Sequence, residues 1–197
     1  MTAILQSHAL DQWFEAASRL IDIRSAIDGR IVAPASSAGL DFAAMVAHAR
    51  DVGGPALRAL NFHQRADMLK ALATYLGAHK DPLYALAAET GATKRDNQID
   101  IDGGIGTLFA YASRGRKDLP SDHFVIEGDS EPLSKGGGFV GVHVLTPLRG
   151  VAVHVNAFNF PCWGMLEKLA PAQLAGVPVI TKPATATAYV AEAVIRL

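Results

Sequence analysis

The stretch that decides the fold is RGVAVHVNAFNFPCWG at residues 149–164, which continues to GVPVITKP at residues 176–183. An apolar run at 150–155 leads into a polar elbow at 156–161 that ends in proline. A helical pattern and a second β-rich run at 177–181 follow. Parallel strands require a crossover connection of this kind, so the order predicts a βαβ unit and an α/β fold. Because the sequence ends soon after the second run, we expect the parallel sheet of this chain to be incomplete.

Composition limits the class of protein. The 197 residues are 50% hydrophobic and 19% charged, which is enough for one well-buried domain, alone or with an appendage. The formal net charge is -1 and the basic residues are scattered, so no strong field favours a nucleic acid or an anionic membrane. We therefore expect neither nucleic acid nor membrane as a partner.

The cysteine and histidine content argues against disulfides and metal. The single cysteine, Cys162, excludes an intrachain disulfide and a multi-cysteine metal site, and it fits a reducing compartment. The seven histidines show no ligand pairing, so we predict no metal and interpret His143 and His154 as core residues of apolar strands. The amino terminus lacks the features of a secretion signal, and no run approaches the about 18 apolar residues of a membrane span. We expect a cytoplasmic protein.

The chain divides into four parts by pattern. Residues 1–36 hold short apolar pieces that suit a strand or hairpin on the surface of something larger. From Ser37, interpreted as a helix cap, residues 37–117 are helical and are predicted to cover one side of the sheet. Residues 118–146 are rich in glycine and proline around two strand-like runs, which on sequence alone predicts a surface hairpin. Residues 147–197 contain the βαβ unit.

Three helices are predicted within the helical part, over residues 62–76, 82–90 and 100–111. Polar residues of the first helix, Arg65 among them, fall mainly on its outer face by helical spacing. The glycine-rich run at 102–106 lacks the spacing of a nucleotide-binding loop and is interpreted as a helix start or a close-packing feature. The residues expected to face inward are Phe62, Ala66, Leu69, Ala73 and Leu76 in the first helix, Leu83, Leu86 and Ala87 in the second, and Ile101, Ile105, Leu108 and Phe109 in the third.

The elbow and the second strand carry a family resemblance. The Phe-Asn-Phe-Pro of the elbow, which contains Asn159, and the Val-x-x-Lys-Pro at the strand end, which contains Lys182, resemble the entry to the nucleotide-binding domain of the aldehyde dehydrogenase superfamily. The resemblance runs over all 197 residues. The wording NAFNFPxWG and KPATATA is similar to the branch that serves phenylacetate and benzoate degradation, whose members act on semialdehydes carried on coenzyme A.

The resemblance implies a fold, an activity and partners. It implies the amino-terminal portion of a Rossmann-like cofactor-binding domain, in an enzyme that oxidises a small-molecule aldehyde to the carboxylic acid. It implies that strands at 124–126 and 139–145 form a β arm toward a partner subunit, so we expect a homodimer or a larger oligomer. It places the nucleophilic cysteine and the water-activating glutamate beyond residue 197, so that this chain alone is expected to be inactive. The alternative hypothesis is a non-catalytic module that binds a nucleotide or completes a partner.

Asn159 is the predicted catalytic residue. Addition of a nucleophile to an aldehyde puts negative charge on the carbonyl oxygen, and a fixed amide N–H aimed at that oxygen lowers the barrier by a few kcal/mol. The resembling enzymes use the matching asparagine in this way. The alternative is an asparagine that only caps the helix beginning near Pro161.

The predicted cofactor site lies at the carboxyl ends of the two parallel strands, where open α/β sheets bind ligands. By resemblance Lys182 holds the adenosine ribose, and Ala184 and Thr185 follow it in the site. Thr185 falls where NAD-preferring relatives commonly carry a glutamate, so we predict NADP, with NAD as the alternative. The competing interpretation is a solvated lysine followed by a threonine that caps the helix at 186–197.

The remaining predicted cofactor contacts are in the first strand and the elbow. Val155, Asn156, Ala157 and Phe158 match the positions that line the nicotinamide site of the resembling enzymes. Cys162 lies in the first turn of a helix, where the dipole would lower the pKa of a thiol. We do not assign it as the nucleophile, because it has no paired base, and interpret it as a small buried residue packed beneath Trp163.

Overall fold

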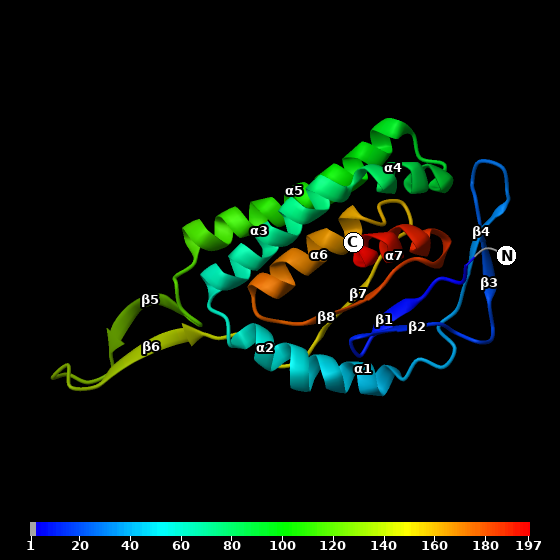
Figure 1. The fold of residues 1–197 in the computed structure, drawn as a ribbon. Coiled ribbons are helices and arrows are strands. Elements are labelled where there is room, and N and C mark those ends of the chain that lie inside the picture. The colour runs from blue at the N-terminus through cyan, green and yellow to red at the C-terminus, as the bar shows by residue number, and fades with distance from the viewer. Residues whose placement is uncertain (1–2) are drawn as a thin grey trace.

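The computed structural model describes residues 3–197 (Figure 1). Two antiparallel hairpins form its amino-terminal part. Their strands are β1 (Ser7–Ala9) with β2 (Gln12–Phe14), and β3 (Ile21–Arg24) with β4 (Ile31–Ala35). The guanidinium of Arg196, near the carboxyl end, lies 4.0 Å from the centre of the Trp13 ring, so the first hairpin contacts the last helix.

The helical part begins later than predicted. Asp41, not Ser37, is the first cap, because its carboxylate accepts a hydrogen bond from the backbone N–H of Ala44 at 2.9 Å. The elements are α1 (Phe42–His48), the π-helical turn η1 (Ala49–Gly53), α2 (Gly54–Arg58), α3 (Phe62–His79), α4 (Asp81–Ala87), the 3-10 turn η2 (Ala88–Thr90) and α5 (Lys94–Asp118). Gly91 ends the α4 region with a φ of 81°, the left-handed conformation that glycine adopts without strain.

Helix α3 has the predicted buried face and one buried residue that the pattern did not predict. The five apolar residues expected to face inward, Phe62, Ala66, Leu69, Ala73 and Leu76, are all buried. Arg65 is also fully buried, at 0% exposure, so its assignment to the outer face was wrong. Its guanidinium donates to backbone carbonyl oxygens of other segments, which replace the water that a surface arginine would bind.

Helix α5 is longer than predicted and crosses the same core. It begins six residues earlier, at Lys94, after a capping box made by Thr93 and Asp96. Ile101, Ile105 and Leu108 are buried as predicted. Phe109 is 40% exposed, so its inward assignment was wrong, because it lies just past the edge of the buried stripe.

The glycine-rich run lies in the middle of α5, so the helix-start interpretation was wrong and the close-packing one was correct. A Cβ added at Gly103 would lie 2.4 Å from Cε3 of Trp163, and one added at Gly104 would lie 3.0 Å from the Cα of Trp163. Glycine is therefore required there so that the following helix can approach. Of the second predicted helix, Leu83 and Ala87 are buried and Leu86 packs against the core.

The predicted βαβ unit is present. Its elements are β7 (Ala152–Val155), α6 (Trp163–Leu174) and β8 (Val179–Lys182), followed by the 3-10 turn η3 (Thr185–Thr187) and α7 (Ala188–Arg196). β7 and β8 pair in parallel, and within residues 3–197 they form a two-stranded sheet. Helix α6 packs against α5 and α3 on one side and the strands on the other (Figure 1). The layered α/β arrangement expected from the sequence is therefore confirmed.

Residues 118–146 form a hairpin that projects away from the helices (Figure 1). Its strands are β5 (Val125–Pro132) and β6 (Val140–Leu145), paired antiparallel. Ile126, Val142 and Val144 are exposed by 55%, 47% and 47%, and Ile126 lies opposite Val144 on one face. His143 is also exposed, so its interpretation as a core residue was wrong. The hairpin offers an apolar face, and its function as a contact between subunits stays a prediction.

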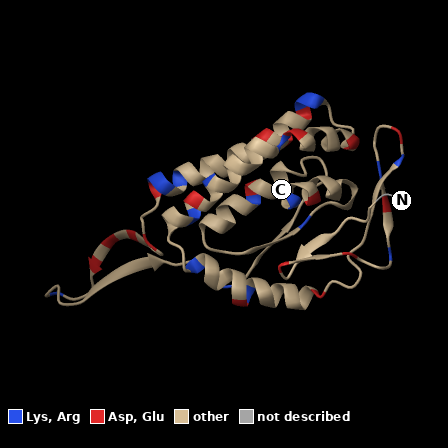
Figure 2. Cartoon of the chain, in the orientation of Figure 1, with Lys and Arg blue, Asp and Glu red and all other residues tan. Residues whose placement is uncertain are grey.

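Charge is interleaved over the surface (Figure 2). Figure 2 shows acidic and basic residues interspersed along α3 and α5, with acidic residues gathered on β5. Of the helices in the described chain, none combines the length and the apolar character that crossing a membrane requires. In the same residues, no group of three His, Cys, Asp or Glu side chains is close enough to hold a metal ion.

Candidate active site

The fold brings the elbow and the tip of β8 together. Val155, the last residue of β7, lies opposite Lys182, the last residue of β8. The backbone N–H of Asn156 then donates to the carbonyl oxygen of Lys182 at 3.1 Å, so the elbow begins where β8 ends. Opposed residues of paired strands point to the same face of a sheet, so the side chains of Val155 and Lys182 share a face. The backbones of the two motifs are therefore adjacent, whereas a shared site for their side chains stays a prediction.

Asn159 and Lys182 both present their side chains to solvent. The residue at the start of α6 is Cys162, which makes no capping hydrogen bond with its own side chain. Asn159 therefore does not cap this helix, and the alternative interpretation of that residue loses its support. In the described part of the chain, Asn159 makes no side-chain hydrogen bond and Lys182 forms no ion pair, so both groups are free for another molecule.

The other predicted contacts divide into exposed and buried groups. Val155 is 71% exposed and Phe158 is 64% exposed, beside an exposed Ala157. Asn156 is different: its side chain is 6% exposed, and neither of its amide atoms has a hydrogen-bond partner. Since the amide of Asn156 points into the protein, its backbone is the part that faces the strand ends. Its assignment to the nicotinamide site stays a prediction.

The segment after β8 carries the last two predicted contacts. Ala184 is half-buried and precedes η3, and Thr185 begins that turn with an exposed side chain. The side chain of neither residue caps η3, and α7 begins after Thr187 with no side-chain cap. The competing interpretation of Thr185 as a helix cap is therefore wrong. Its hydroxyl is available to solvent.

Asp100 holds the first turn of α6, and the sequence did not reveal this contact. From the second turn of α5, its two carboxylate oxygens accept hydrogen bonds from the backbone N–H groups of Cys162 at 3.2 Å and Trp163 at 2.7 Å. The side chain is 97% buried, and burial raises its pKa above the ordinary value while the two N–H donors act in the opposite direction. The first N–H groups of a helix have no partner within it, so Asp100 supplies a cap from a different helix.

Thr187 holds the elbow from the other side. Its hydroxyl donates to the carbonyl oxygen of Phe158 at 3.2 Å, and the residue is 4% exposed. The signal in the sequence was weak for both anchors. An aspartate between two isoleucines and a threonine among alanines are features that pattern analysis places on a surface. Their roles depend on contacts with residues far away in the chain.

Cys162 is buried, as predicted. It is 1% exposed, and burial together with the negative charges of Asp100 and Asp102 raises the pKa of its thiol far above the ordinary value. Both effects disfavour the thiolate that nucleophilic attack needs. Cys162 is a packing residue.

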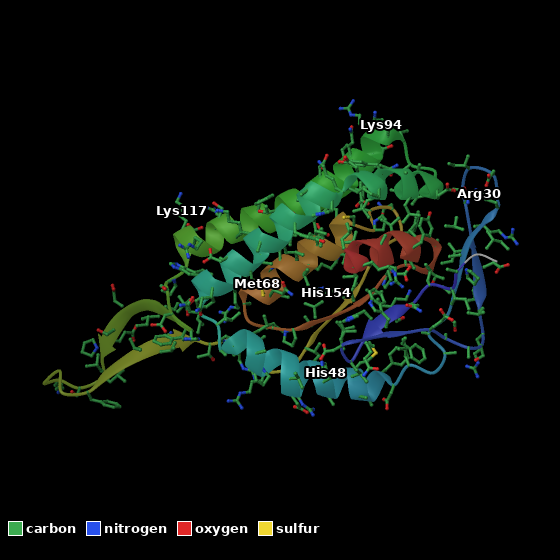
Figure 3. The ribbon with its side chains drawn as sticks, viewed as in Figure 1. Arg30, His48, Met68, Lys94, Lys117 and His154 are labelled. Atoms are coloured by element: carbon green, nitrogen blue, oxygen red, sulfur yellow. The ribbon has the colours of Figure 1, made fainter. Side chains whose placement is uncertain are left out.

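His154 lies on the opposite face of β7 from Val155, beneath α6 (Figure 3). Its Nδ1 is buried without a hydrogen-bond partner, so the expectation of one satisfied nitrogen is not met at that atom. Burial, and the nearby charge of Lys168, lower the pKa of this imidazole. The neutral ring is therefore part of the packing between strand and helix.

Two surface hollows of the chain lie away from the elbow. One is formed by residues between Lys117 and Ile126, at the base of the hairpin, and the other by residues between Asp67 and His79, on the outer side of α3. Neither includes a predicted site residue. The elbow and the tip of β8 are an open surface of the described chain, and their part in a site stays a prediction.

Comparison with known proteins identifies the family. Residues 13–197 match the aldehyde dehydrogenase family. The chain is 42% identical to the 3,4-dehydroadipyl-CoA semialdehyde dehydrogenase of Aromatoleum evansii over 189 residues, which is 95% of this chain and 36% of that protein. It is 29% identical to the D-glyceraldehyde dehydrogenase (NADP(+)) of Picrophilus torridus over 68% of this chain and 25% of that protein.

The fold matches as well. The lactaldehyde dehydrogenase of Escherichia coli superposes with a TM-score of 0.82 at 18% identity, over 99% of this chain and 39% of that protein. The chain therefore spans little more than a third of the length of the proteins from Aromatoleum evansii and Escherichia coli. Since the match begins in the first hairpin and continues through the elbow and β8 to the last residue, the chain belongs to the aldehyde dehydrogenase family.

Proposed function

We propose that this chain supplies the oxyanion donor and one wall of the cofactor site in an NADP-dependent oxidation of an aldehyde to its carboxylic acid. The observation that carries the proposal is the hydrogen bond between the N–H of Asn156 and the carbonyl oxygen of Lys182, which joins the elbow to the tip of β8. Asn159 follows this bond by three residues and Lys182 ends β8, so the carboxamide and the ammonium belong to adjacent exposed segments, which supports the proposal. Membership of the family favours this function over a non-catalytic module.

The groups at the strand ends suit NADP. Lys182 is an exposed cation without an ion pair in the described chain, and Thr185 offers an exposed hydroxyl three residues later. An ammonium attracts ribose oxygens and phosphate, and a hydroxyl can donate to a 2′-phosphate. A carboxylate in place of Thr185 would repel that phosphate and would accept from ribose hydroxyls instead. We therefore propose NADP over NAD.

Asn159 is proposed to act on the aldehyde. When a nucleophile adds to the carbonyl carbon, the C=O π electrons move to oxygen, and the amide N–H of Asn159 donates to the resulting oxyanion. The nucleophile is proposed to come from residues outside this chain, because Cys162 is buried and its thiol has a raised pKa. When bound, the nicotinamide accepts the hydride.

The substrate and the assembly are proposed from relatives and from the hairpin. The relative from Aromatoleum evansii acts on a semialdehyde of a coenzyme A thioester by its name, and at 42% identity we propose a CoA-linked semialdehyde of aromatic degradation here. The exposed apolar face of β5 and β6 supports a homodimer or a larger oligomer through residues 118–146.

The first prediction concerns the cofactor and uses the 197-residue chain itself. Calorimetric titration is expected to show NADP binding at least about tenfold more tightly than NAD, the free-energy equivalent of one charge-assisted hydrogen bond. Lys182→Ala should weaken both nucleotides, and Thr185→Glu should reverse the preference. Lys117→Ala is the matched control, since Lys117 is an exposed lysine at the carboxyl-terminal end of α5, away from the elbow (Figure 3). Equal binding of both nucleotides, or binding of neither, would remove the proposal.

A further inference from the structure

The first turn of α6 has no cap of its own. A helix begins with N–H groups that need partners, and a Ser, Thr, Asp or Asn at the first position normally supplies one. Here that position holds Cys162, which makes no such bond. Both free donors instead point to the carboxylate of Asp100, with N···O distances of 3.2 Å from Cys162 and 2.7 Å from Trp163.

Helix α5 also fixes the lateral position of this turn. Asp100 and Gly103 are three residues apart and therefore lie on one face of α5. Trp163 packs so closely on Gly103 that a methyl group there would come within 2.4 Å of the indole ring. The carboxylate sets the height of the turn along α5, and the glycine sets its distance from α5. Together the two contacts prevent the start of α6 from moving along α5.

The elbow is held on its other side by the end of the chain. The buried hydroxyl of Thr187 donates to the carbonyl oxygen of Phe158 at 3.2 Å. Asn159 thus lies between an anchored carbonyl one residue before it and two anchored N–H groups at Cys162 and Trp163. A catalytic donor must be held to within about 0.5 Å of its working position, and an exposed loop residue does not achieve this without supporting bonds.

We propose that Asp100 is a positioning residue: by capping α6 from α5, it fixes the backbone of the elbow and so the direction of the Asn159 carboxamide. This inference rests on the proposed role of Asn159 and extends it. Asp100 does not touch substrate or cofactor and acts through the first turn of α6. Its burial without a cationic partner in the described chain is explained by this function, since the two N–H groups are its counterpart.

The test uses the full 197-residue chain and the variants Asp100→Ala, Asp100→Asn and Asp102→Asn. Asp102 is the matched control, because it lies two residues along α5, where its carboxylate accepts from the Tyr84 hydroxyl at 2.9 Å on the surface. Hydrogen exchange resolved by residue is expected to be about five- to tenfold faster at Cys162 and Trp163 in Asp100→Ala, which is the usual effect of a lost cap. Exchange at Leu69 in α3 should change by less than about twofold.

A second measurement separates positioning from simple capping. The backbone order parameter of Asn159 is expected to be about 0.85 in the parent chain, which is typical of a rigid backbone. In Asp100→Ala it should fall below about 0.6, which is typical of a flexible one. Asp100→Asn keeps one acceptor oxygen and should lie between the two, and Asp102→Asn should match the parent. If Asp100→Ala does not fold, the Asp100→Asn variant decides the question.

Two results would overturn the inference. One is faster exchange at Cys162 and Trp163 with an unchanged order parameter at Asn159, which would make Asp100 a cap only. The other is an equal rise of exchange at Leu69, which would make it a general stabiliser. These measurements are made without a nucleotide. Failure of NADP binding would therefore remove the proposed function, and it would not decide whether Asp100 positions the elbow.

Discussion

At each end of helix α6, a buried charged side chain from another helix forms hydrogen bonds with the backbone. At the amino-terminal end the carboxylate of Asp100 accepts two N–H groups, and at the carboxyl-terminal end the guanidinium Nε of Arg65 donates to the carbonyl of Leu174 at 2.8 Å. Each charge has the sign that complements its end of the helix dipole, and each comes from another helix of the layer. The amino-terminal end, which has no cap of its own, is thus completed by a neighbouring helix. The carboxyl-terminal end also has its own cap, because Gly176 is left-handed and its N–H donates to the carbonyl of Gln173 at 2.9 Å.

The ends differ in how many segments each charged group joins. Arg65 also donates through Nη1 to the carbonyl of Leu60 at 2.6 Å and of Leu57 at 3.2 Å, so it ties α2, α3 and α6 together. Asp100 joins only α5 to the turn that follows the elbow. We infer that the Arg65 end carries stability of the whole chain, whereas the Asp100 end carries the local geometry of the site.

Replacing Arg65 should therefore have the greatest effect on folding. Arg65→Ala leaves three carbonyl oxygens without their donor and opens a void, with an expected loss of about 3 to 5 kcal/mol in the free energy of unfolding. Urea unfolding followed by circular dichroism measures it. Arg116→Ala, which removes an exposed ion pair between α5 and Asp67, is the control and should cost less than about 1 kcal/mol. Similar losses in both variants would contradict the assignment.

The contact between α5 and Trp163 gives an intermediate effect. Gly103→Ala puts a methyl group 2.4 Å from the indole ring, so the amino-terminal end of α6 must shift, at a cost of about 1 to 3 kcal/mol. Gly106→Ala on the same helix meets nothing within 4 Å, and it should stabilise the protein by about 0.5 to 1 kcal/mol because alanine favours a helix. Opposite signs in thermal unfolding are the expected result, and equal signs would show that the ring is not held against α5.

The smallest effect concerns pH. Burial raises the pKa of Asp100 in the folded chain, whereas the unfolded chain has the ordinary value. At a pH between these two pKa values, the folded state therefore binds more protons than the unfolded state. Its contribution to stability is fully present below the unfolded pKa and is lost as pH rises through the folded pKa. Asp100→Asn removes this dependence, so the stability of the parent relative to the variant should decline with rising pH across that window. Parallel pH profiles from urea unfolding would contradict the effect of burial.

Sequence periodicity predicted the elements whose burial follows a simple stripe. The inward residues of α3 from Phe62 to Leu76 and the strand, helix, strand order around the elbow were predicted correctly because neighbours along the chain determine them. The same reasoning placed Arg65 on the surface, since a wheel treats every arginine as solvated. Its burial depends on carbonyls at Leu57, Leu60 and Leu174, which only the folded chain brings together.

The candidate site shows the same division. The adjacency of the elbow and Lys182 follows from the parallel pairing of two strands, which the motif order implies. The anchors Asp100 and Thr187 do not follow from it, because they lie 62 and 29 residues away from their partners in the chain. A helix that starts at a cysteine was the available clue, since such a start requires a cap from elsewhere.

The thiol of Cys162 can report on the contact between α5 and the start of α6, which is called the seam below. It is the chain's single sulfhydryl, it belongs to the first residue of the capped turn, and it is buried while that turn is in place. An alkylating or disulfide-forming probe can reach it only during transient opening of the seam, so its labelling rate counts those openings. Local opening at the base of the elbow can thus be measured in the parent chain, without an introduced cysteine or an attached dye.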